Sequence, residues 1–304
     1  MLRELRAGGI ELPLTAEALE AAYPVRDFES FLGWFAVAHV LEGAGLDLYE
    51  HVIAAHVERL KAQGVVYAEI MVASGSLPTD PGEAAERMMR FRAWVDGLEG
   101  GEIQVELLIA FGRNRTLERA EAVATRIIRV FEEGAIAGVA LAGPERGYPV
   151  APLARCFDRF HAAGMSIEIH AAEWCGPESA WDALEHGHPN RLGHGTHVFD
   201  DERLVEVLLE RRLHIEMCPT SNVLTGSIGR IDEHPIGRAL ERGLNVGVNN
   251  DDPGAFGCSM ESEHVLLMDR FGFSNEDLRQ LTLNALRARF KRELRGPAAA
   301  VAVS

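Results

Sequence analysis

The stretch Ser166-Ile167-Glu168-Ile169-His170-Ala171-Ala172-Glu173 decides the fold, because it is a short apolar strand that ends in a histidine and a glutamate. Two further stretches have the same form: Arg191-Leu192-Gly193-His194-Gly195 and Val246-Gly247-Val248-Asn249-Asn250-Asp251-Asp252-Pro253. In a barrel of parallel strands, all the strand carboxyl ends open onto one face, so groups that are distant in sequence meet there. Imidazoles and carboxylates gathered at such a mouth are the groups that a metal-assisted hydrolase needs.

A repeated unit extends this pattern over most of the chain. Each unit has a helical stretch, usually a glycine, and then a short run rich in valine, isoleucine and leucine. Helices commonly end on glycine, because glycine accepts positive φ without steric cost. Strands that alternate with helices at this spacing predict a parallel sheet with right-handed crossovers. We predict seven strands, at residues 65–70, 103–110, 139–142, 166–170, 191–194, 213–217 and 244–248.

Seven strands leave a choice between a closed (β/α) barrel, which has eight, and a doubly wound sheet, which tolerates fewer. The first residues, Leu2 to Ala7, resemble the last turns of a helix that ends at Gly8 and has no start of its own. A strand and turn missing upstream would explain this feature. The α/β fold that we predict is therefore a (β/α)8 TIM-type barrel that lacks its first strand in this chain.

The carboxyl-terminal part is expected to close this single domain. Ser274 opens a capping box with Asp277, so a last helix should run from there to about Leu294. We expect the barrel domain to span residues 1–295. Residues 296–304 are small and are expected to form a flexible tail.

Composition narrows the classes of function. The chain has 304 residues, of which 47% are hydrophobic and 25% charged, as in a globular protein, and no apolar run approaches the roughly 20 residues of a membrane span. The net charge of −16 argues against nucleic-acid binding and favours a small substrate that is neutral or cationic. The first residues lack the apolar core of a signal peptide. Four cysteines without CxxC spacing indicate reduced thiols in a cytoplasmic protein, and the oligomeric state stays open.

Each polar strand end also has a simpler interpretation. His170 could be a hydrogen-bonded residue of the rim, and Asp251-Asp252-Pro253 could be a turn with both side chains in water. His194 is more suggestive, because the glycines on both sides would let a ligand approach the backbone. Two adjacent carboxylates at the end of an apolar strand repel each other unless a cation or a donor compensates. The coincidence of all these strand ends favours a functional site.

The set of motifs resembles the adenosine deaminase family of the amidohydrolase superfamily. The matching stretches are His-Ala-Ala-Glu from residue 170, Arg-Leu-Gly-His-Gly from residue 191, Cys-Pro-Thr-Ser-Asn from residue 218, Asn-Asn-Asp-Asp-Pro from residue 249 and Leu-Ala-Gly-Pro-Glu from residue 141. The resemblance covers roughly residues 5 to 290. It implies a zinc-dependent (β/α)8 barrel that hydrolyses the 6-amino group of a purine nucleoside, an adenosine-like small molecule, and releases ammonia.

The resemblance also implies roles for single residues. His170 and Asp251 would be ligands of one zinc ion per chain, and Glu173 would give a proton to purine N1. His194 would orient and deprotonate the attacking water. Asp252 would bind N7, and the backbone amide of Gly143 would meet N3. Five apolar residues resemble the lid that covers the substrate in the family: Phe28, Phe31, Leu32, Trp34 and Phe35. Their simpler interpretation is an amphipathic helix that packs on the barrel.

The sequence also departs from the family. The resemblance implies that the first strand of the family carries a His-x-His pair that completes the zinc site. No such pair occurs before Gly8 in this chain. A catalytic zinc usually has three protein ligands. The chain could thus be an enzyme that lacks its N-terminal strand here, through a late start, or a non-catalytic member that binds a purine or a partner protein. It could also deaminate adenine or aminofutalosine, although residues 218–222 and 224–226 favour the nucleoside branch.

Overall fold

The computed structural model describes residues 25, 30–31, 46–290 and 293–303. The strands are β1 (Tyr67–Ala73), β2 (Gln104–Gly112), β3 (Gly138–Ala142), β4 (Ser166–Ala171), β5 (Arg191–His194), β6 (His214–Met217) and β7 (Val246–Val248). The longer helices are α4 (Leu46–Ala62), α5 (Pro81–Leu98), α6 (Leu117–Glu132), α7 (Ala154–Ala162), α8 (Pro177–His186), α9 (Glu202–Arg211), α13 (Met260–Phe271), α14 (Asn275–Ala288) and α15 (Gly296–Val303). Short helices complete the description: α10 (Pro219–Leu224), α11 (Ile236–Glu241) and α12 (Pro253–Phe256).

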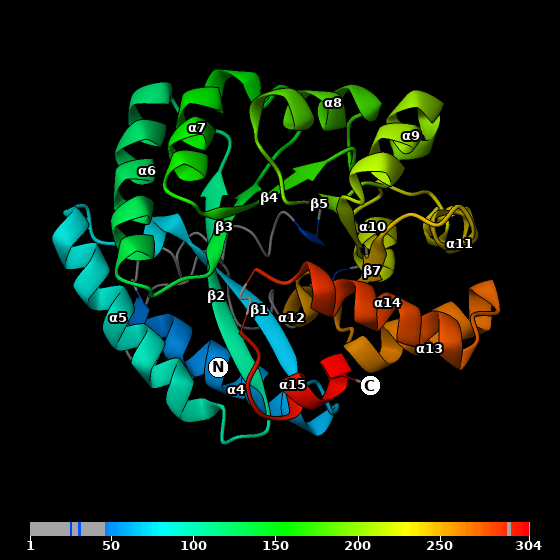
Figure 1. Cartoon of the computed structure of the whole chain (residues 1–304), viewed down its shortest axis with the longest axis horizontal. Coiled ribbons are helices and arrows are strands. Elements are labelled where there is room, and N and C mark those ends of the chain that lie inside the picture. Colours follow the sequence, from blue (N-terminus) through cyan, green and yellow to red (C-terminus); the bar gives the residue numbers. More distant parts are fainter. Residues whose placement is uncertain (1–24, 26–29, 32–45, 291–292, 304) are drawn as a thin grey trace.

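The seven strands form one parallel sheet in chain order, from β1 to β7. The sheet curls into a half-barrel with helices on its outer side (Figure 1). This is the TIM-type α/β architecture that the strand spacing predicts. Among the described residues, β1 and β7 are the two edges of the sheet, and no eighth strand pairs with either of them.

All seven predicted strands are confirmed, with shifts at the two edges. The strand expected at residues 65–70 lies at Tyr67–Ala73, and the one expected at 244–248 is reduced to Val246–Val248. The side chains of β4 alternate between two environments, as the period of two in a strand requires. Ile167 and Ile169 are fully buried in the hydrophobic core, whereas Glu168 contacts Arg191 of the adjacent strand.

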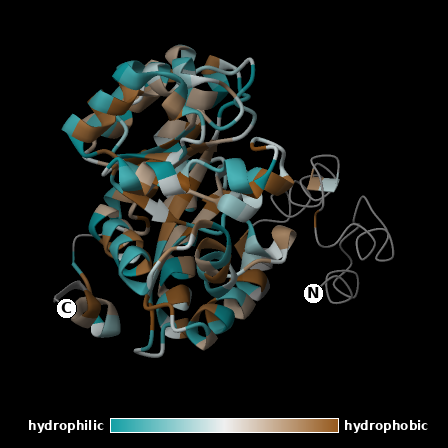
Figure 2. Ribbon diagram, turned by 90° about the vertical axis from the view of Figure 1, so that its right-hand side faces the viewer, coloured by the Kyte–Doolittle hydropathy of each residue, from teal (hydrophilic) through white to brown (hydrophobic). Residues whose placement is uncertain are grey.

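A hydrophobic layer lies between the sheet and the surrounding helices. Figure 2 shows apolar colour along the central strands, while the helices around them alternate between apolar and hydrophilic segments. Helix α6 illustrates the pattern, because Val123, Ile127 and Val130 recur at helical spacing and are all buried. Within the described part of the chain, no helix combines the length and the apolar character that crossing a bilayer requires.

A charged layer lies inside the half-barrel, around the Arg191 guanidinium. Its Nη2 atom lies 2.6 Å from a Glu69 carboxylate oxygen and 2.7 Å from one of Glu168, and its Nε atom lies 3.2 Å from Glu216. The ring of Phe290 covers the guanidinium, with 3.7 Å between the Arg191 Cζ atom and the ring centroid. Burial alone would raise the pKa of Glu168, but Arg191 outweighs this effect and holds that pKa well below its usual range.

The carboxyl-terminal elements differ from the expectation. The capping box of Ser274 and Asp277 is present, but α14 ends at Ala288 and not near Leu294. The chain turns inward there, because the Phe290 backbone N–H donates to Glu69 Oε1 at 2.8 Å. Residues 296–303, expected as a flexible tail, form α15, in which Ala298 is buried. The three consecutive alanines from Ala298 favour this helix, because alanine has the highest helix propensity. The extent of the single domain, residues 1–295, stays a prediction.

Replacing Arg191 with methionine should destabilise the protein by about 3–5 kcal/mol, because the three carboxylates around it would lose the buried guanidinium that pairs with all of them. Urea unfolding measures this loss. The matched control is Arg242→Met, which removes an exposed ion pair with Glu202 and should leave the free energy of unfolding almost unchanged. Equal losses in the two variants would contradict the structural role of Arg191.

Candidate active site

The strand ends bring the predicted site residues to one end of the sheet. His170 is the fifth residue of β4, and Glu173 follows in the turn after it. His194 is the last residue of β5. Asp251 and Asp252 lie between β7 and α12, and Gly143 follows β3. Because the strands are parallel, all these positions lie at the same, carboxyl-terminal rim.

The His170 ring depends on its neighbours in β4 and β5. His170 pairs with Gly193 across the two strands, and a Cβ atom at Gly193 would lie 2.6 Å from His170 Cδ2. Gly193 is therefore needed to make room for an imidazole of the protein itself. The His170 Nε2 atom lies 3.5 Å from Glu168 Oε1. A carboxylate beside one ring nitrogen is the arrangement in which histidines commonly bind a metal through the other.

The turn that carries Glu173 is held by a second carboxylate. Glu145 Oε2 accepts hydrogen bonds from the backbone N–H groups of Glu173, Trp174 and Cys175, at 3.1, 2.6 and 3.0 Å. The hydroxyl of Ser179 donates to the other Glu145 oxygen. Four donors to one buried carboxylate fix the backbone of the turn, so they set the position of the Glu173 side chain.

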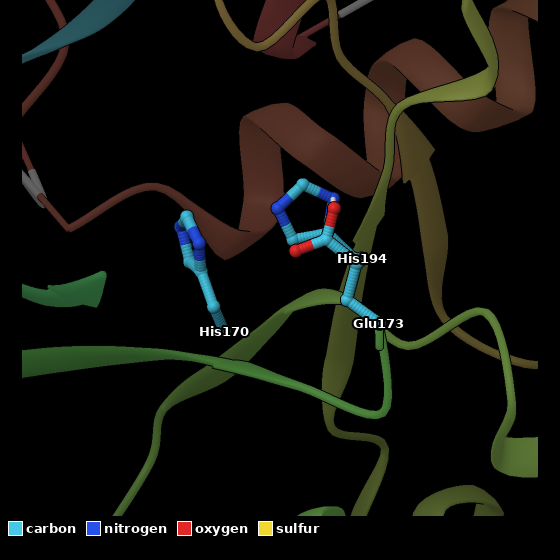
Figure 3. Close-up of side chains that lie close together, drawn as sticks. All are labelled: His170, Glu173 and His194. Atoms are coloured by element: carbon cyan, nitrogen blue, oxygen red, sulfur yellow. Dashed lines mark ion pairs between the residues drawn. The ribbon is translucent and has the colours of Figure 1, made fainter. Parts of the chain in front are cut away.

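The Glu173 carboxyl is buried, with 8% of the residue exposed. Burial, with the nearby charge of Asp251 as a second cause, raises the pKa of Glu173 to about 8. At neutral pH the side chain is thus held in its protonated form, which is the form that a proton donor needs. Figure 3 shows Glu173 and His194 side by side, with His170 facing them across the site. Glu173 Oε1 lies 3.5 Å from His194 Nδ1.

The His194 ring is buried among polar groups. Its Nδ1 atom lies 3.1 Å from the side-chain nitrogen of Asn222, and the Asn222 oxygen lies 3.2 Å from His234 Nε2. The rings of His170 and His194 meet edge to face, with centroids 4.7 Å apart. Burial lowers the pKa of His194, so the ring is held in its neutral form.

The two aspartates after β7 differ in their contacts. The hydroxyl of Ser221 donates to Asp251 Oδ2 at 2.6 Å, which orients that carboxylate. Both aspartates are exposed to solvent at this rim. The protein atoms crowded around Asp252, together with the Asp251 charge, raise its pKa. Two carboxylates in sequence thus repel each other here, as expected for a place that a cation would stabilise.

Three non-glycine residues at this rim have left-handed backbone conformations. The φ angles are 51° for Ala172, 65° for His194 and 54° for Asp251. Such conformations cost roughly 1–3 kcal/mol each, and they persist only where the surrounding structure imposes them. Two of the three residues carry side chains of the predicted site. The strain is therefore concentrated where the backbone must turn these groups toward the mouth.

The predicted lid falls mostly outside the described residues. Of its five members only Phe31 is described, and its ring stacks on Phe256 of α12 with centroids 5.2 Å apart. Val25 joins the same cluster, and its backbone N–H donates to Ala255 at 2.9 Å. Phe28, Leu32, Trp34 and Phe35 lie outside the described part of the chain. The role of these residues as a lid stays a prediction.

Two groups of side chains could hold a metal ion at this rim. The possible ligand atoms of His170, Glu173 and His194 lie within 4.8 Å of one another, and so do those of His194, Cys218 and Asp251. Imidazole and carboxylate ligands suit zinc. The predicted ligands His170 and Asp251 belong to different groups of these two, and together they would supply two of the three protein ligands that a catalytic zinc usually has. The chemistry of the described residues therefore fits zinc, but their predicted ligand set is one short of the usual number.

Sequence reasoning missed several residues that support the site. Ser221 and Asn222 belong to a stretch that the sequence singled out, and Glu145 ends another, but none received a role there. His234 carried no signal, because it lies on a loop far from any predicted strand end. Arg113 is also buried, and its guanidinium donates to the backbone carbonyl of His170. The only sequence signal for any of these supporting residues was that Ser221, Asn222 and Glu145 are polar residues within the quoted motifs.

The raised pKa of Glu173 makes folding stability depend on pH. The carboxyl is protonated in the folded state up to about pH 8, but it ionises near pH 4.3 in the unfolded state. Its contribution to stability is thus complete below about pH 4.3 and is lost as the pH rises toward 8. Glu173→Gln cannot ionise, so in metal-free protein it should be more stable than the unmutated chain by about 1–4 kcal/mol at pH 8.

Urea unfolding at pH 5 and pH 8 measures this difference, which should grow with pH. Glu185→Gln removes an exposed carboxylate and serves as the control. A Glu173→Gln difference that is equal at both pH values would contradict the buried, protonated carboxyl.

Comparison with known proteins agrees with this geometry. The family described as "Adenosine deaminase" matches residues 5–295. An adenine deaminase of Chlorobium phaeobacteroides is 30% identical over 294 residues, which cover 94% of this chain and 85% of that protein. An adenosine deaminase of Shewanella loihica is 30% identical over 255 residues, which cover 81% of this chain and 75% of that protein.

A solved structure has the same fold. The crystal structure of an adenine deaminase from Arthrobacter aurescens superposes with a TM-score of 0.85 and 28% sequence identity, and the match covers 98% of this chain and 90% of that one. The family match extends over nearly the whole chain. The chain is therefore an aminohydrolase-type enzyme and belongs to the adenosine deaminase family, within the metal-dependent amidohydrolase superfamily.

Proposed function

We propose that this protein hydrolyses the 6-amino group of a purine nucleoside such as adenosine, with one zinc ion per chain, and releases ammonia. The observation that carries the proposal is the buried Glu173 carboxyl, whose pKa is raised to about 8 beside the neutral ring of His194. A carboxylic acid that stays protonated at neutral pH can give its proton to a ring nitrogen of a purine. The four free cysteines support a cytoplasmic location.

Glu173 moves the protons in this reaction. It gives its proton to N1, which draws electrons from C6 and opens C6 to attack by water. The water oxygen bonds to C6, and the bond between C6 and the amino nitrogen breaks. One water proton leaves with the ammonia, and the other restores Glu173. Atoms and charges therefore balance with no further reactant.

The metal would be held by His170 and Asp251. A bound zinc ion lowers the pKa of water from 15.7 to about 7, and so it supplies a nucleophile at neutral pH. Glu168 beside His170 and Ser221 beside Asp251 would orient these two ligands. His194 would hold the attacking water. Asp252 and the Gly143 amide would bind the purine ring at N7 and N3.

Free adenine is a second candidate substrate. It is favoured by the names of relatives, because the proteins from Chlorobium phaeobacteroides and Arthrobacter aurescens are both adenine deaminases. Residues 218–222 and 224–226 argue for the nucleoside. The net charge of −16 argues for a small neutral ligand of either kind and against nucleic acid. Purine binding without turnover is a further alternative, favoured by a predicted ligand set of only two residues.

Ammonia release from adenosine, adenine and aminofutalosine, together with zinc content, tests the proposal. Adenosine should be deaminated with the highest kcat/KM, and removal of zinc by a chelator should abolish turnover until zinc is restored. Glu173→Gln should lower kcat/KM by about 10²–10⁴-fold, because the variant cannot donate the proton to N1. The exposed control Glu185→Gln should retain full activity.

Three results would change the proposal. Faster turnover of adenine would replace the nucleoside by the free base as the substrate. A folded, zinc-loaded sample that binds purines but releases no ammonia would establish the binding function instead. Equal activity of Glu173→Gln and the unmutated chain would remove Glu173 from the reaction.

A further inference from the structure

A buried chain of hydrogen bonds reaches the His194 ring from the outside of the site. It runs from the backbone of Ile236 through His234 and Asn222 to His194. His234 and His194 are each 3% exposed, and Asn222 is fully buried. The direction of each bond in such a chain can be derived, because a backbone N–H can only donate.

The backbone N–H of Ile236 fixes the donor and acceptor roles of the two His234 ring nitrogens. The Ile236 nitrogen lies 3.3 Å from His234 Nδ1, so this ring nitrogen must accept and carries no proton. Burial lowers the pKa of His234 to about 3, so the ring is neutral and its single proton sits on Nε2. His234 Nε2 therefore donates to the Asn222 side-chain oxygen at 3.2 Å.

The backbone N–H of Cys218 shows which end of the Asn222 side-chain amide is the oxygen. This N–H donates to the same Asn222 oxygen at 3.3 Å. Both neighbours of this atom are donors, so it must be the carbonyl oxygen, and the amide cannot be flipped without two donors facing an NH2 group. The Asn222 NH2 group is then the end that faces His194 Nδ1, at 3.1 Å. His194 Nδ1 therefore accepts a hydrogen bond.

The remaining neighbour of His194 Nδ1 does not change this assignment. Glu173 Oε1 lies 3.5 Å from this nitrogen, farther than the Asn222 side-chain nitrogen at 3.1 Å. The backbone of Asn222 is fixed independently, because its carbonyl accepts from Ile228 N–H at 2.9 Å and from the Ser227 hydroxyl at 3.1 Å. The amide thus has little freedom to turn away from His194.

We propose that Asn222 and His234 are positioning residues that hold His194 as the tautomer with its proton on Nε2. In Figure 3 the second nitrogen of the His194 ring lies on the side of His170. His194 presents a hydrogen-bond donor there. It binds the attacking oxygen as a donor, and its Nε2 atom neither accepts the proton of the water nor binds the metal. This role replaces the deprotonation that the family resemblance implies.

The two histidines of the rim are thereby assigned different roles. The other ring nitrogen of a metal-bound histidine normally donates to an acceptor. His170 has such an acceptor, Glu168, at 3.5 Å from Nε2. His194 has a donor, Asn222, in the corresponding place. The inference rests on the proposed function for the identity of the attacking oxygen, but the tautomer itself does not.

Nitrogen-15 NMR of histidine-labelled, metal-free protein reads the tautomer directly. The His194 signals are assigned by their loss in His194→Gln. We expect the proton on Nε2 in the unmutated chain and its transfer to Nδ1 in Asn222→Asp, where an acceptor replaces the amide donor. A proton on Nδ1 in the unmutated chain would overturn the inference, whatever the protein turns over.

Kinetics of matched variants test whether the tautomer of His194 matters for turnover. Asn222→Asp should lower kcat by about 100-fold or more with little change in KM, because the bond from His194 strengthens as charge develops on the oxygen. The control is Asn245→Asp, because Asn245 pairs with His214 Nδ1 through its side-chain oxygen, at 3.1 Å, before β7 and away from the rim. The aspartate keeps that acceptor, so the His214 ring should keep its proton on Nδ1. His234→Gln retains an amide donor and should keep more activity than His234→Leu. Equal kcat values for Asn222→Asp and Asn245→Asp would reject the role.

Zinc content separates this inference from the proposed function. His170→Ala should lose zinc, whereas His194→Ala should bind as much zinc as the unmutated chain. Loss of zinc in His194→Ala would overturn the inference, because His194 would then be a ligand. If none of the purines is deaminated, the proposed function fails, and the NMR result still decides the tautomer.

Discussion

The Arg191 guanidinium is the contact on which the inside of the half-barrel depends. It joins carboxylates from three different strands, Glu69, Glu168 and Glu216, and it is covered by the ring of Phe290. Glu168 also stands beside His170, so the charged layer reaches the rim through one side chain. Glu168 therefore links the ion pairs of Arg191 between the strands to the position of His170, a predicted metal ligand.

The rim adds a second constraint, which is the direction of its hydrogen bonds. Glu145 accepts from the turn that carries Glu173, and Asn222 donates to His194. One contact fixes a backbone and the other fixes a tautomer. Both act on groups that would move or hold protons around the substrate. Positive φ angles at His194 and Asp251 show that the backbone is held there against its own preference.

Much of the fold and site could be predicted from the sequence, because each predicted side chain follows its own apolar strand. His170, His194 and Asp251 needed only the rule that parallel strands end on one face. Phe290 could not be predicted, because its place depends on Glu69, more than two hundred residues earlier. His234 was also missed, since it reaches Asn222 only through the packing of a loop that has no periodic pattern. Asn222 itself was visible as a motif residue, but its role depends on that contact.

The central claim is that a cation is held by His170 and Asp251, while His194 stands beside it as a donor. Anomalous X-ray diffraction at the zinc edge, from crystals grown with zinc, tests this claim most directly. We predict one strong peak per chain, within about 2.0–2.2 Å of a His170 nitrogen and an Asp251 oxygen and beyond bonding distance of His194. A peak bonded to His194, or no peak at this rim, would contradict the account.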